Sequence, residues 1–327
     1  MNSFEWTNAR TVDEAIAQLG GNAVIKAGGV DLLDRLKEGL EAPARLVNIR
    51  SIAGLDGIQD DPKEGLRIGP LVTLARLASD STVRRRYAAL ADAAGHAATP
   101  QIRNMATVGG NLLQRPRCWY YRSEQFHCLK KGGSRCFAIE GENQYHAIFD
   151  NKLCAIVHPS GVATALVALG AKLELTGAKG KRDFALEDFF IKPEQDVRRE
   201  NTLGASELVT EIRVPAPADN LRSAYIKQRE KESFDWPIAE VAVALACAGN
   251  RCSQASIVLG AAAPVPWRAR GAETALAGKD INPETARAAA RAALDGATPL
   301  SQNAYKVSIF EVVIRRAILA ATTYGGA

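Results

Sequence analysis

The sequence lacks the features that would place it in a membrane or outside the cell. No stretch of its 327 residues reaches the ~18 consecutive apolar residues of a transmembrane helix, which predicts no membrane insertion. The N-terminal "MNSFEWTNAR" has no basic start followed by an apolar stretch, so no secretory signal is expected. We therefore expect a cytoplasmic protein, or a periplasmic one if it is exported together with a signal-bearing partner.

An excess of charge of one sign is also missing. The chain has 41 basic and 36 acidic residues, well interspersed, for a net charge of +5. This balance is too mild to indicate a nucleic-acid partner or attraction to a membrane surface. The apolar content of 47% allows a large core, and the length predicts two or three domains. No long internal repeat is present.

Several chemical signatures are absent as well. No G-x-G-x-x-G follows a strand-like run, so a Rossmann nucleotide-binding unit is not indicated. No C-x2-C pair occurs, which argues against zinc fingers, zinc ribbons and the closely spaced ferredoxin-type clusters. No acid or base stands out as a substrate-activating group. We therefore predict no catalytic residue in this chain.

The periodicity that is present predicts an α+β protein. Residues 1–55 alternate short strands with amphipathic helices and form a βαβ-like unit, and residues 56–217 form a second α+β unit. The stretch "PAPADNLRS" predicts a domain boundary, because it combines two prolines with polar residues. Beyond it, residues 218–327 predict a meander of three antiparallel strands followed by helices at 283–296 and 303–322.

Two glycine pairs, 28–29 and 109–110, each follow a strand-like run. They lie in "IKAGGVDLL" and in "TPQIRNMATVGGNLLQ", and Thr107 and Asn111 add a hydroxyl and an amide to the second. Glycine lets the backbone approach an anion closely, and the amides that follow can point at phosphate oxygens. Each stretch alone is equally typical of a tight strand–helix turn. Together they favour a pyrophosphate held between two turns.

Four of the six cysteines fall in "CWYYRSEQFHCLKKGGSRCFAIEGENQYHAIFDNKLC", residues 118–154. Their spacing is C-x9-C-x7-C-x17-C: Cys118, Cys128, Cys136 and Cys154. In a reducing compartment, clustered cysteines favour a metal site over disulfides. Four thiolates on an irregular loop can hold a [4Fe–4S] cluster, and the alternative is a set of unpaired, partly buried thiols. His127 and His146, in the same stretch, are predicted to be structural.

Outside this stretch, a strand-like segment "YIKQR" places Lys227 where it faces either solvent or a negative ligand. Cys247 and Cys252 lie in or near strands and are predicted to be small buried hydrophobes.

In combination, these motifs resemble a known family. The order "AGGVDLL", "IRNMATVGGNLLQ", "HPSGVATAL", "ELVTEIRVP", "YIKQR" and "GAAAPVPWRA" resembles the flavin-binding subunits of the molybdenum hydroxylases. These include relatives of xanthine dehydrogenase, aldehyde oxidoreductase and CO dehydrogenase. The cysteine-rich insertion, residues 115–155, is similar to that of periplasmic-type aldehyde oxidoreductase flavin subunits, which carry an extra [4Fe–4S] cluster. The flavin subunit of 4-hydroxybenzoyl-CoA reductase also has an insertion, with a spacing that fits less well.

The resemblance implies FAD, bound by a two-subdomain domain of the vanillyl-alcohol-oxidase type at 1–217. A C-terminal α+β domain like that of CO dehydrogenase flavoproteins would follow at 218–327. Carried over residue by residue, the FAD contacts are Lys26, Ala27, Gly28, Gly29, Val30, Asp31, Leu32, Thr107, Gly109, Gly110, Asn111, Leu208, Val209 and Lys227. Cys118, Cys128, Cys136 and Cys154 would be the cluster ligands. The family reads "HPSD" where this chain has "HPSG", so Gly161 removes an acid while main-chain contacts remain.

The resemblance further implies an oxidoreductase subunit that transfers electrons. A large partner subunit would oxidise an aldehyde or related substrate at a molybdenum cofactor, and a small partner with [2Fe–2S] clusters would carry electrons to the FAD. An external acceptor would then receive them. The alternatives are the flavin subunit of a 4-hydroxybenzoyl-CoA-reductase-like or xanthine-dehydrogenase-like complex, a standalone FAD oxidase, and an assembly module without redox function.

Overall fold

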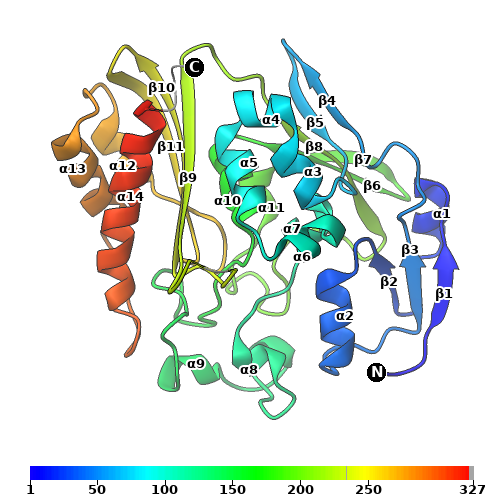
Figure 1. Cartoon of the computed structure of the whole chain (residues 1–327). Helices are drawn as coiled ribbons and strands as arrows, with labels where there is room; N and C mark the ends of the chain where they lie inside the picture. Colours follow the sequence, from blue (N-terminus) through cyan, green and yellow to red (C-terminus); the bar gives the residue numbers. More distant parts are fainter. Residues whose placement is uncertain (233, 324–327) are drawn as a thin grey trace.

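Three sheets organise the protein. The computed structural model describes residues 1–232 and 234–323, and its sheets have three, five and four strands (Figure 1). The predicted α+β class is therefore confirmed. Within the described part of the chain, no helix is long and apolar enough to cross a membrane.

The N-terminal unit is a three-stranded parallel sheet. Strands β1 (Glu5–Asn8), β2 (Ala23–Lys26) and β3 (Arg45–Asn48) lie in the order β1-β3-β2. Helices α1 (Val12–Ala17) and α2 (Val30–Lys37) provide the connections that parallel neighbours require. The predicted βαβ character of this unit is confirmed, with β1 as an additional edge strand.

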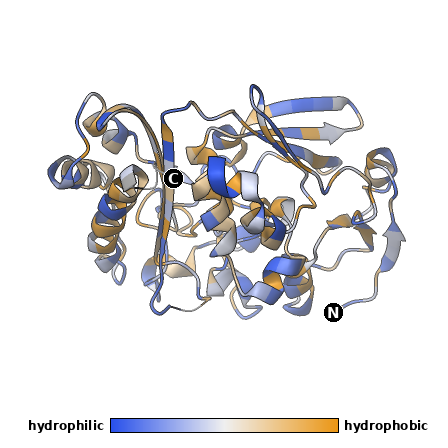
Figure 2. Ribbon diagram, turned by 45° about the horizontal axis from the view of Figure 1, so that its top comes forward, coloured by the Kyte–Doolittle hydropathy of each residue, from blue (hydrophilic) through white to orange (hydrophobic). Residues whose placement is uncertain are grey.

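The middle of the chain forms the five-stranded antiparallel sheet, in the order β4-β5-β8-β6-β7. Its strands are β4 (Ile58–Asp61), β5 (Gly65–Ile68), β6 (Lys172–Gly177), β7 (Gly180–Ala185) and β8 (Glu207–Val214). The helices of this region are α3 (Leu74–Ser79), α4 (Ser81–Arg86), α5 (Ala88–Gly95), α10 (Gly161–Ala168) and α11 (Leu186–Phe189). Residues of α3, α5 and α10 pack with β5, β6 and β8 in the largest hydrophobic core. In Figure 2, hydrophobic residues gather where these central helices meet the sheets.

The segment before the second glycine pair differs from its prediction as a strand-like run. It forms two short helices, α6 (Pro100–Met105) and α7 (Val108–Leu112), and the glycines lie inside α7. Thr99 caps α6 by accepting a hydrogen bond from the amide of Ile102, and Pro100 occupies the first turn, where its missing N–H has no consequence. Local capping thus makes this segment helical, although the spacing of its apolar residues alone is typical of a strand.

The C-terminal region forms a four-stranded antiparallel sheet in the order β12-β11-β10-β9. Its strands are β9 (Leu221–Gln228), β10 (Ala239–Ala248), β11 (Arg251–Gly260) and the short β12 (Trp267–Arg268). The predicted three-strand meander is confirmed, and β12 extends it. Helices α12 (Arg270–Leu276), α13 (Pro283–Ala293) and α14 (Tyr305–Thr323) cover one face.

The central strand β10 has two buried faces, because its side chains alternate between two cores. Val241 and Val243 pack towards the C-terminal helices, whereas Ala242 and Ala244 pack towards the core that contains α5 and α10. Cys247 and Cys252 are paired in register and buried among the C-terminal core, which confirms them as small buried hydrophobes.

The cysteine-rich insertion is mostly irregular and contains three single-turn helices: α8 (Trp119–Arg122), the 3₁₀-helix η1 (Leu129–Lys131) and α9 (Phe137–Glu140). Figure 1 shows α8 and α9 at the bottom of the molecule, below the four-stranded sheet and beside the lower end of α2.

Candidate functional site

A cavity of about 390 Å³ lies where the three sheets approach one another. Its walls come from the turn between β2 and α2, from α6 and α7, from the start of β8, and from β9 with the connection to β10. Every predicted FAD contact except Lys26 lines this cavity. Lys26 lies beside it instead, with its Nζ 5.4 Å from the ring centroid of Trp6.

The first glycine turn offers free backbone donors to the cavity. Gly29 has a φ of 85° and begins α2, a conformation that glycine adopts without strain. A Cβ at Gly28 would lie 2.0 Å from the carbonyl oxygen of Met105, so the turn passes directly against α6. Among the described residues, none accepts a hydrogen bond from the amides of Val30, Asp31 or Leu32. These amides, at the positive end of α2, form an anion site.

The second glycine turn is closed by internal hydrogen bonds. The amide of Gly109 donates to Pro70 O at 2.9 Å, and the amide of Gly110 donates to Thr107 Oγ1 at 3.1 Å. A Cβ at Gly109 would lie 2.8 Å from Pro70 Cβ, so glycine is needed here for close packing. The amides of Gly109 and Gly110 are therefore not free to bind a ligand.

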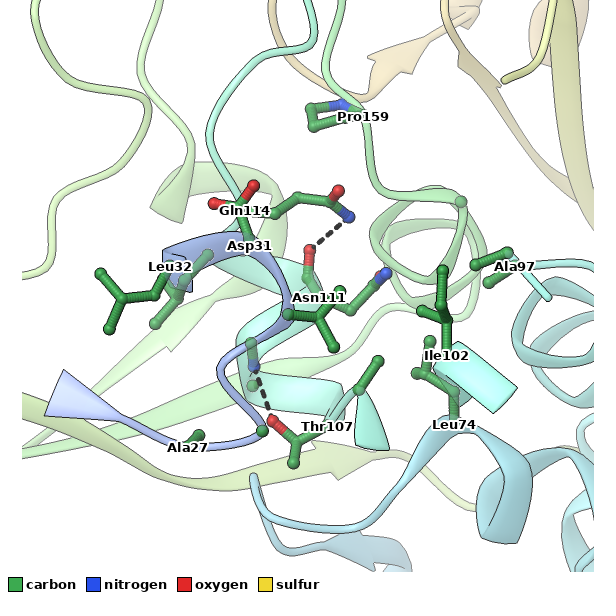
Figure 3. Close-up of a pocket in the computed structure, with 18 of the residues that line it drawn as sticks. Ala27, Asp31, Leu32, Leu74, Ala97, Ile102, Thr107, Asn111, Gln114 and Pro159 are labelled. Atoms are coloured by element: carbon green, nitrogen blue, oxygen red, sulfur yellow. Dashed lines mark hydrogen bonds between the residues drawn. The ribbon is translucent and has the colours of Figure 1, made fainter. Parts of the chain in front are cut away.

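Side chains supply the polar groups of the second turn. Asn111 Oδ1 accepts a hydrogen bond from Ser160 Oγ at 2.6 Å, which fixes the orientation of the amide. Its Nδ2 has no acceptor among the described residues and is available to the cavity. In Figure 3, the turn that carries Ala27, Asp31 and Leu32 runs beside the segment that carries Thr107 and Asn111. The two turns thus lie next to each other, with free amides on the first and polar side chains on the second.

Asp31 is engaged by arginines rather than free for a ligand. Its carboxylate pairs with Arg117 at 2.8 Å, Arg122 at 2.7 Å and Arg35 at 3.1 Å, and accepts from the backbone amide of Arg115 at 3.0 Å. Burial raises the pKa of Asp31, but Arg117, Arg122 and Arg35 together hold it below its usual value. Since three of these partners lie in the cysteine-rich insertion, Asp31 fastens that insertion to α2.

The far wall of the cavity carries Lys227 on β9, with Leu208 and Val209 from β8. Lys227 Nζ donates to His96 O at 3.1 Å, and burial lowers the pKa of this lysine. The solvent-facing alternative for Lys227 is therefore wrong. Leu208 and Val209 are buried and give this wall an apolar surface.

The structure adds residues that were not predicted: Tyr225, Glu240 and the segment 234–237 also line the cavity. A Cβ at Gly161 would lie 2.4 Å from the Tyr225 hydroxyl, so Tyr225 occupies the space beside that glycine. One signal was present in the sequence, because Glu240 is the single acid in the otherwise apolar strand "AEVAVALACA". Its neighbours across the sheet were not deducible from that strand.

Comparison with known proteins agrees with this geometry. The family described as "FAD binding domain in molybdopterin dehydrogenase" matches residues 2–217, and "CO dehydrogenase flavoprotein C-terminal domain" matches residues 224–321. The chain belongs to the FAD-binding subunits of the molybdenum hydroxylases. FAD is accordingly the cofactor that fits the cavity, because α2 provides the anion site that a pyrophosphate requires.

Two curated relatives of this flavin subunit are similar over nearly their whole length. The aldehyde oxidoreductase FAD-binding subunit PaoB of Escherichia coli is 34% identical, over 94% of each chain. The carbon monoxide dehydrogenase medium chain of Hydrogenophaga pseudoflava is 31% identical, over 97% of this chain and 96% of that one.

Solved structures share the fold of this flavin subunit. A structure of carbon monoxide dehydrogenase from Hydrogenophaga pseudoflava superposes with a TM-score of 0.77 at 29% identity, covering 99% of this chain and 98% of that one. Quinoline 2-oxidoreductase from Pseudomonas putida 86 also gives a TM-score of 0.77, at 25% identity and 98% coverage of each chain.

In the cysteine-rich insertion, three cysteines occupy equivalent local positions. Cys118, Cys128 and Cys136 each immediately precede a single-turn helix, α8, η1 and α9 respectively. Backbone amides of the following residues hydrogen-bond to the sulfurs of Cys118 and Cys136. The fourth, Cys154, hydrogen-bonds to Cys136, which lowers the pKa of the Cys136 thiol and raises that of Cys154.

Aromatic rings surround these thiols. Tyr120 packs edge-on against Phe126 with centroids 4.9 Å apart, and Phe126 lies 5.2 Å from Phe137. His146 Nε2 lies 3.2 Å from Cys118 Sγ, and burial lowers the pKa of His146 to about 4. Within residues 1–232 and 234–323, no three His, Cys, Asp or Glu side chains converge as they would around a single metal ion. The four-cysteine ligand set therefore stays a prediction.

The cysteine-rich insertion is anchored near its C-terminal end as well as at Asp31. Lys306, at the start of α14, is fully buried and donates to His146 O at 2.9 Å and to Ala261 O at 2.7 Å. Asn303 donates to His146 O at 3.0 Å and to Ala147 O at 3.1 Å. Buried backbone carbonyls are thereby satisfied, and the insertion is held between α2 and α14.

Proposed function

We propose that this chain is the FAD- and [4Fe–4S]-carrying electron-transfer subunit of a heteromeric molybdenum hydroxylase. A large partner subunit oxidises the substrate at its molybdenum cofactor, and a small partner subunit delivers the electrons through [2Fe–2S] clusters. The observation that carries the proposal is the cavity between the free amides of α2 and the half-buried Lys227. We also keep the division into domains 1–217 and 218–327 as part of the proposal.

The residues of this cavity have distinct roles in holding the cofactor. The amides of Val30, Asp31 and Leu32 bind the pyrophosphate from one side, and Asn111 Nδ2 binds it from the other. Leu208 and Val209 pack against the flavin ring, and Lys227 approaches it with a positive charge. When bound, FAD supplies the exchange between one-electron and two-electron transfer, and the protein orients it and tunes its electrostatics.

The proposed substrate class is an aldehyde, oxidised on the partner subunit. Two observations support this choice: the 34% identity to an aldehyde oxidoreductase subunit and the cysteine-rich insertion. The external acceptor receives electrons at the same cavity, whose rim includes the exposed Trp236.

Cys118, Cys128, Cys136 and Cys154 are the proposed cluster ligands. Three arguments support them: the position of Cys118, Cys128 and Cys136 before a helical turn, the backbone amides directed at two of the sulfurs, and the aromatic shell that limits water. Each iron of a cube takes one thiolate, so these four cysteines would complete the ligand set of one cluster. The buried ammonium of Lys130 acts electrostatically on Cys154 and would offset part of the thiolate charge.

Metal and flavin analysis of the purified complex tests both cofactors. We expect one FAD and, in this chain, roughly four irons. Cys128→Ser should remove that iron and leave FAD in place, whereas Cys252→Ser, a buried cysteine of β11, should change neither. Iron unchanged in Cys128→Ser would disprove the cluster. A folded chain that carries no FAD in its complex would favour an assembly module, and substrate oxidation by the isolated chain would favour a standalone oxidase.

A further inference from the structure

Glu240 occupies a niche that is shaped for a carboxyl group. It is only 3% exposed and lies on the face of β10 that packs towards α10. A Cβ on Gly260 would lie 2.5 Å from Glu240 Oε2, and a Cβ on Gly161 would lie 3.1 Å from the same oxygen. Any larger residue at either glycine would displace the acid. The two glycines therefore make room for a buried carboxyl group on the wall of the cavity.

Glu240 is connected to the cavity through two residues of β9. Lys227 is its register partner on the neighbouring strand, and the Tyr225 hydroxyl forms a side-chain hydrogen bond with its carboxylate. All three side chains line the cavity. A carboxyl, a phenol and an ammonium thus form one connected group beside the proposed cofactor, and none of them holds the cofactor's phosphates.

The charged surroundings leave Glu240 able to change its protonation state near neutrality. Burial raises the pKa of Glu240 to about 7, against the opposing effects of Lys227 and Tyr225. On the elements packed beside it, α10 and β11, Gly161 and Gly260 lie against Glu240, and the hydroxyl of Thr164 lies beside Gly260. Further charges act on Tyr225 and Lys227 from α5, from α6 and from the β9–β10 connection: Asp92, Arg103, Arg229 and Asp235.

We propose that Glu240 is the proton-exchanging residue of the flavin site, an inference that rests on the proposed function. Two electrons that arrive from the partner's [2Fe–2S] clusters add two negative charges to the cavity. One proton taken up by the cofactor and one taken up by the Glu240 carboxylate balance them, and both protons come from water. When the external acceptor removes the two electrons, the cofactor and the Glu240 carboxyl each return one proton to water. Lys227 and Tyr225 position the Glu240 carboxylate and stabilise its ionised form.

The test is the pH dependence of the flavin reduction potential in the complete complex, followed by the visible absorption of the flavin. Above about pH 7, where Glu240 is ionised before reduction, one additional proton per two electrons should steepen the dependence by about 30 mV per pH unit. In Glu240→Gln the plot of the reduction potential against pH should lack this change of slope, which we call the break. Glu273→Gln, which removes a carboxylate on the opposite face of the same sheet, should keep it.

Tyr225→Phe provides a second test that does not remove the acid. Because the Tyr225 hydrogen bond lowers the pKa of Glu240, its loss should move the break to higher pH. A role in packing alone would leave the break where it is. If the wild-type complex binds no FAD, the proposed function fails first. If FAD content is normal and the break persists in Glu240→Gln, only the assignment of Glu240 is overturned.

Discussion

The two glycine turns of the cavity look alike in sequence and differ in structure. The turn at Gly28 and Gly29 leaves the first amides of α2 without acceptors in the described part of the chain, whereas the amides of Gly109 and Gly110 are bonded to Pro70 and Thr107. A glycine pair therefore serves two different needs. In the first turn it exposes donors to an anion, and in the second it lets a helix pack against a neighbouring turn.

The difference arises from what lies opposite each turn. The first turn faces the cavity, with α6 behind Gly28. In the second turn, Pro70 packs against Gly109, and the Thr107 side chain caps α7 by accepting a hydrogen bond from the amide of Gly110. Substitutions in one turn at a time should therefore show whether that turn contributes to FAD binding or to the free energy of unfolding.

Gly28→Val should have the largest effect. Its Cβ would lie 2.0 Å from the backbone oxygen of Met105, which cannot move without moving α6. The first turn of α2 should be displaced, and FAD content should fall roughly tenfold or more, because overpacking against backbone forces the chain to shift. Flavin absorbance per purified chain measures this. Gly95→Ala, whose Cβ would meet Ala78 at an ordinary 3.7 Å, is the control and should retain FAD.

Asp31→Asn should weaken the first turn through its ion pairs. The substitution leaves Arg117, Arg122 and Arg35 without their shared carboxylate, and the free energy of unfolding should fall by about 3 kcal/mol at neutral pH. The pKa of Asp31 is lowered in the folded state, so its contribution is present above pH 3.8 and is lost as the pH falls through the lowered pKa.

Urea unfolding over a pH series checks the prediction for Asp31. The stability difference between wild type and Asp31→Asn should shrink as the pH falls below 3.8. A difference that stays constant down to strongly acidic pH would show that the arginines do not act through the charge of Asp31.

Gly109→Ala should affect stability more than binding. The new Cβ would lie 2.8 Å from Pro70 Cβ and 3.1 Å from Pro70 O, so α7 must shift slightly, and the free energy of unfolding should fall by about 2 kcal/mol. FAD per folded chain should remain close to normal, because the amide of Gly109 already donates to Pro70. Loss of FAD with unchanged thermal stability would reverse the assignment of the two turns.

Thr107→Val should have the smallest effect of the series. It removes the oxygen that accepts the Gly110 amide and caps α7, which should reduce the free energy of unfolding by about 1 kcal/mol. Thr107→Ser retains the hydroxyl and should restore most of the loss. Thermal unfolding of the two variants side by side makes the comparison, and a Thr107→Val chain as stable as the wild type would show that the cap does not contribute.

Much of the site could be predicted from sequence, because its residues lie in short contiguous motifs. The turn from Ala27 to Leu32, the pair Leu208 and Val209, and Lys227 all line the cavity. Lys26, adjacent to the first turn, has its side chain near Trp6, and its contact with the cofactor stays a prediction. The segment before Thr107 was predicted as strand-like, since the alternation of its apolar residues carries no information about the caps that make it helical.

Other parts of the site depend on contacts between distant segments. Tyr225 and Glu240 meet Gly161 because β9, β10 and α10 pack together, although these residues are far apart in the chain. Asp31 was predicted as a ligand contact, and only the folded structure brings the arginines of the cysteine-rich insertion to its carboxylate.

The sequence by itself determined the order of the elements, the two glycine pairs and the clustering of four cysteines, because periodicity, turn residues and spacing are local properties. Tertiary structure alone decided which backbone amides at the two glycine turns remain free. It also decided that a buried acid lies on the wall of the cavity. The physical reason is that a hydrogen-bond donor is free, and a carboxyl group is desolvated, only by virtue of what the rest of the chain places beside it.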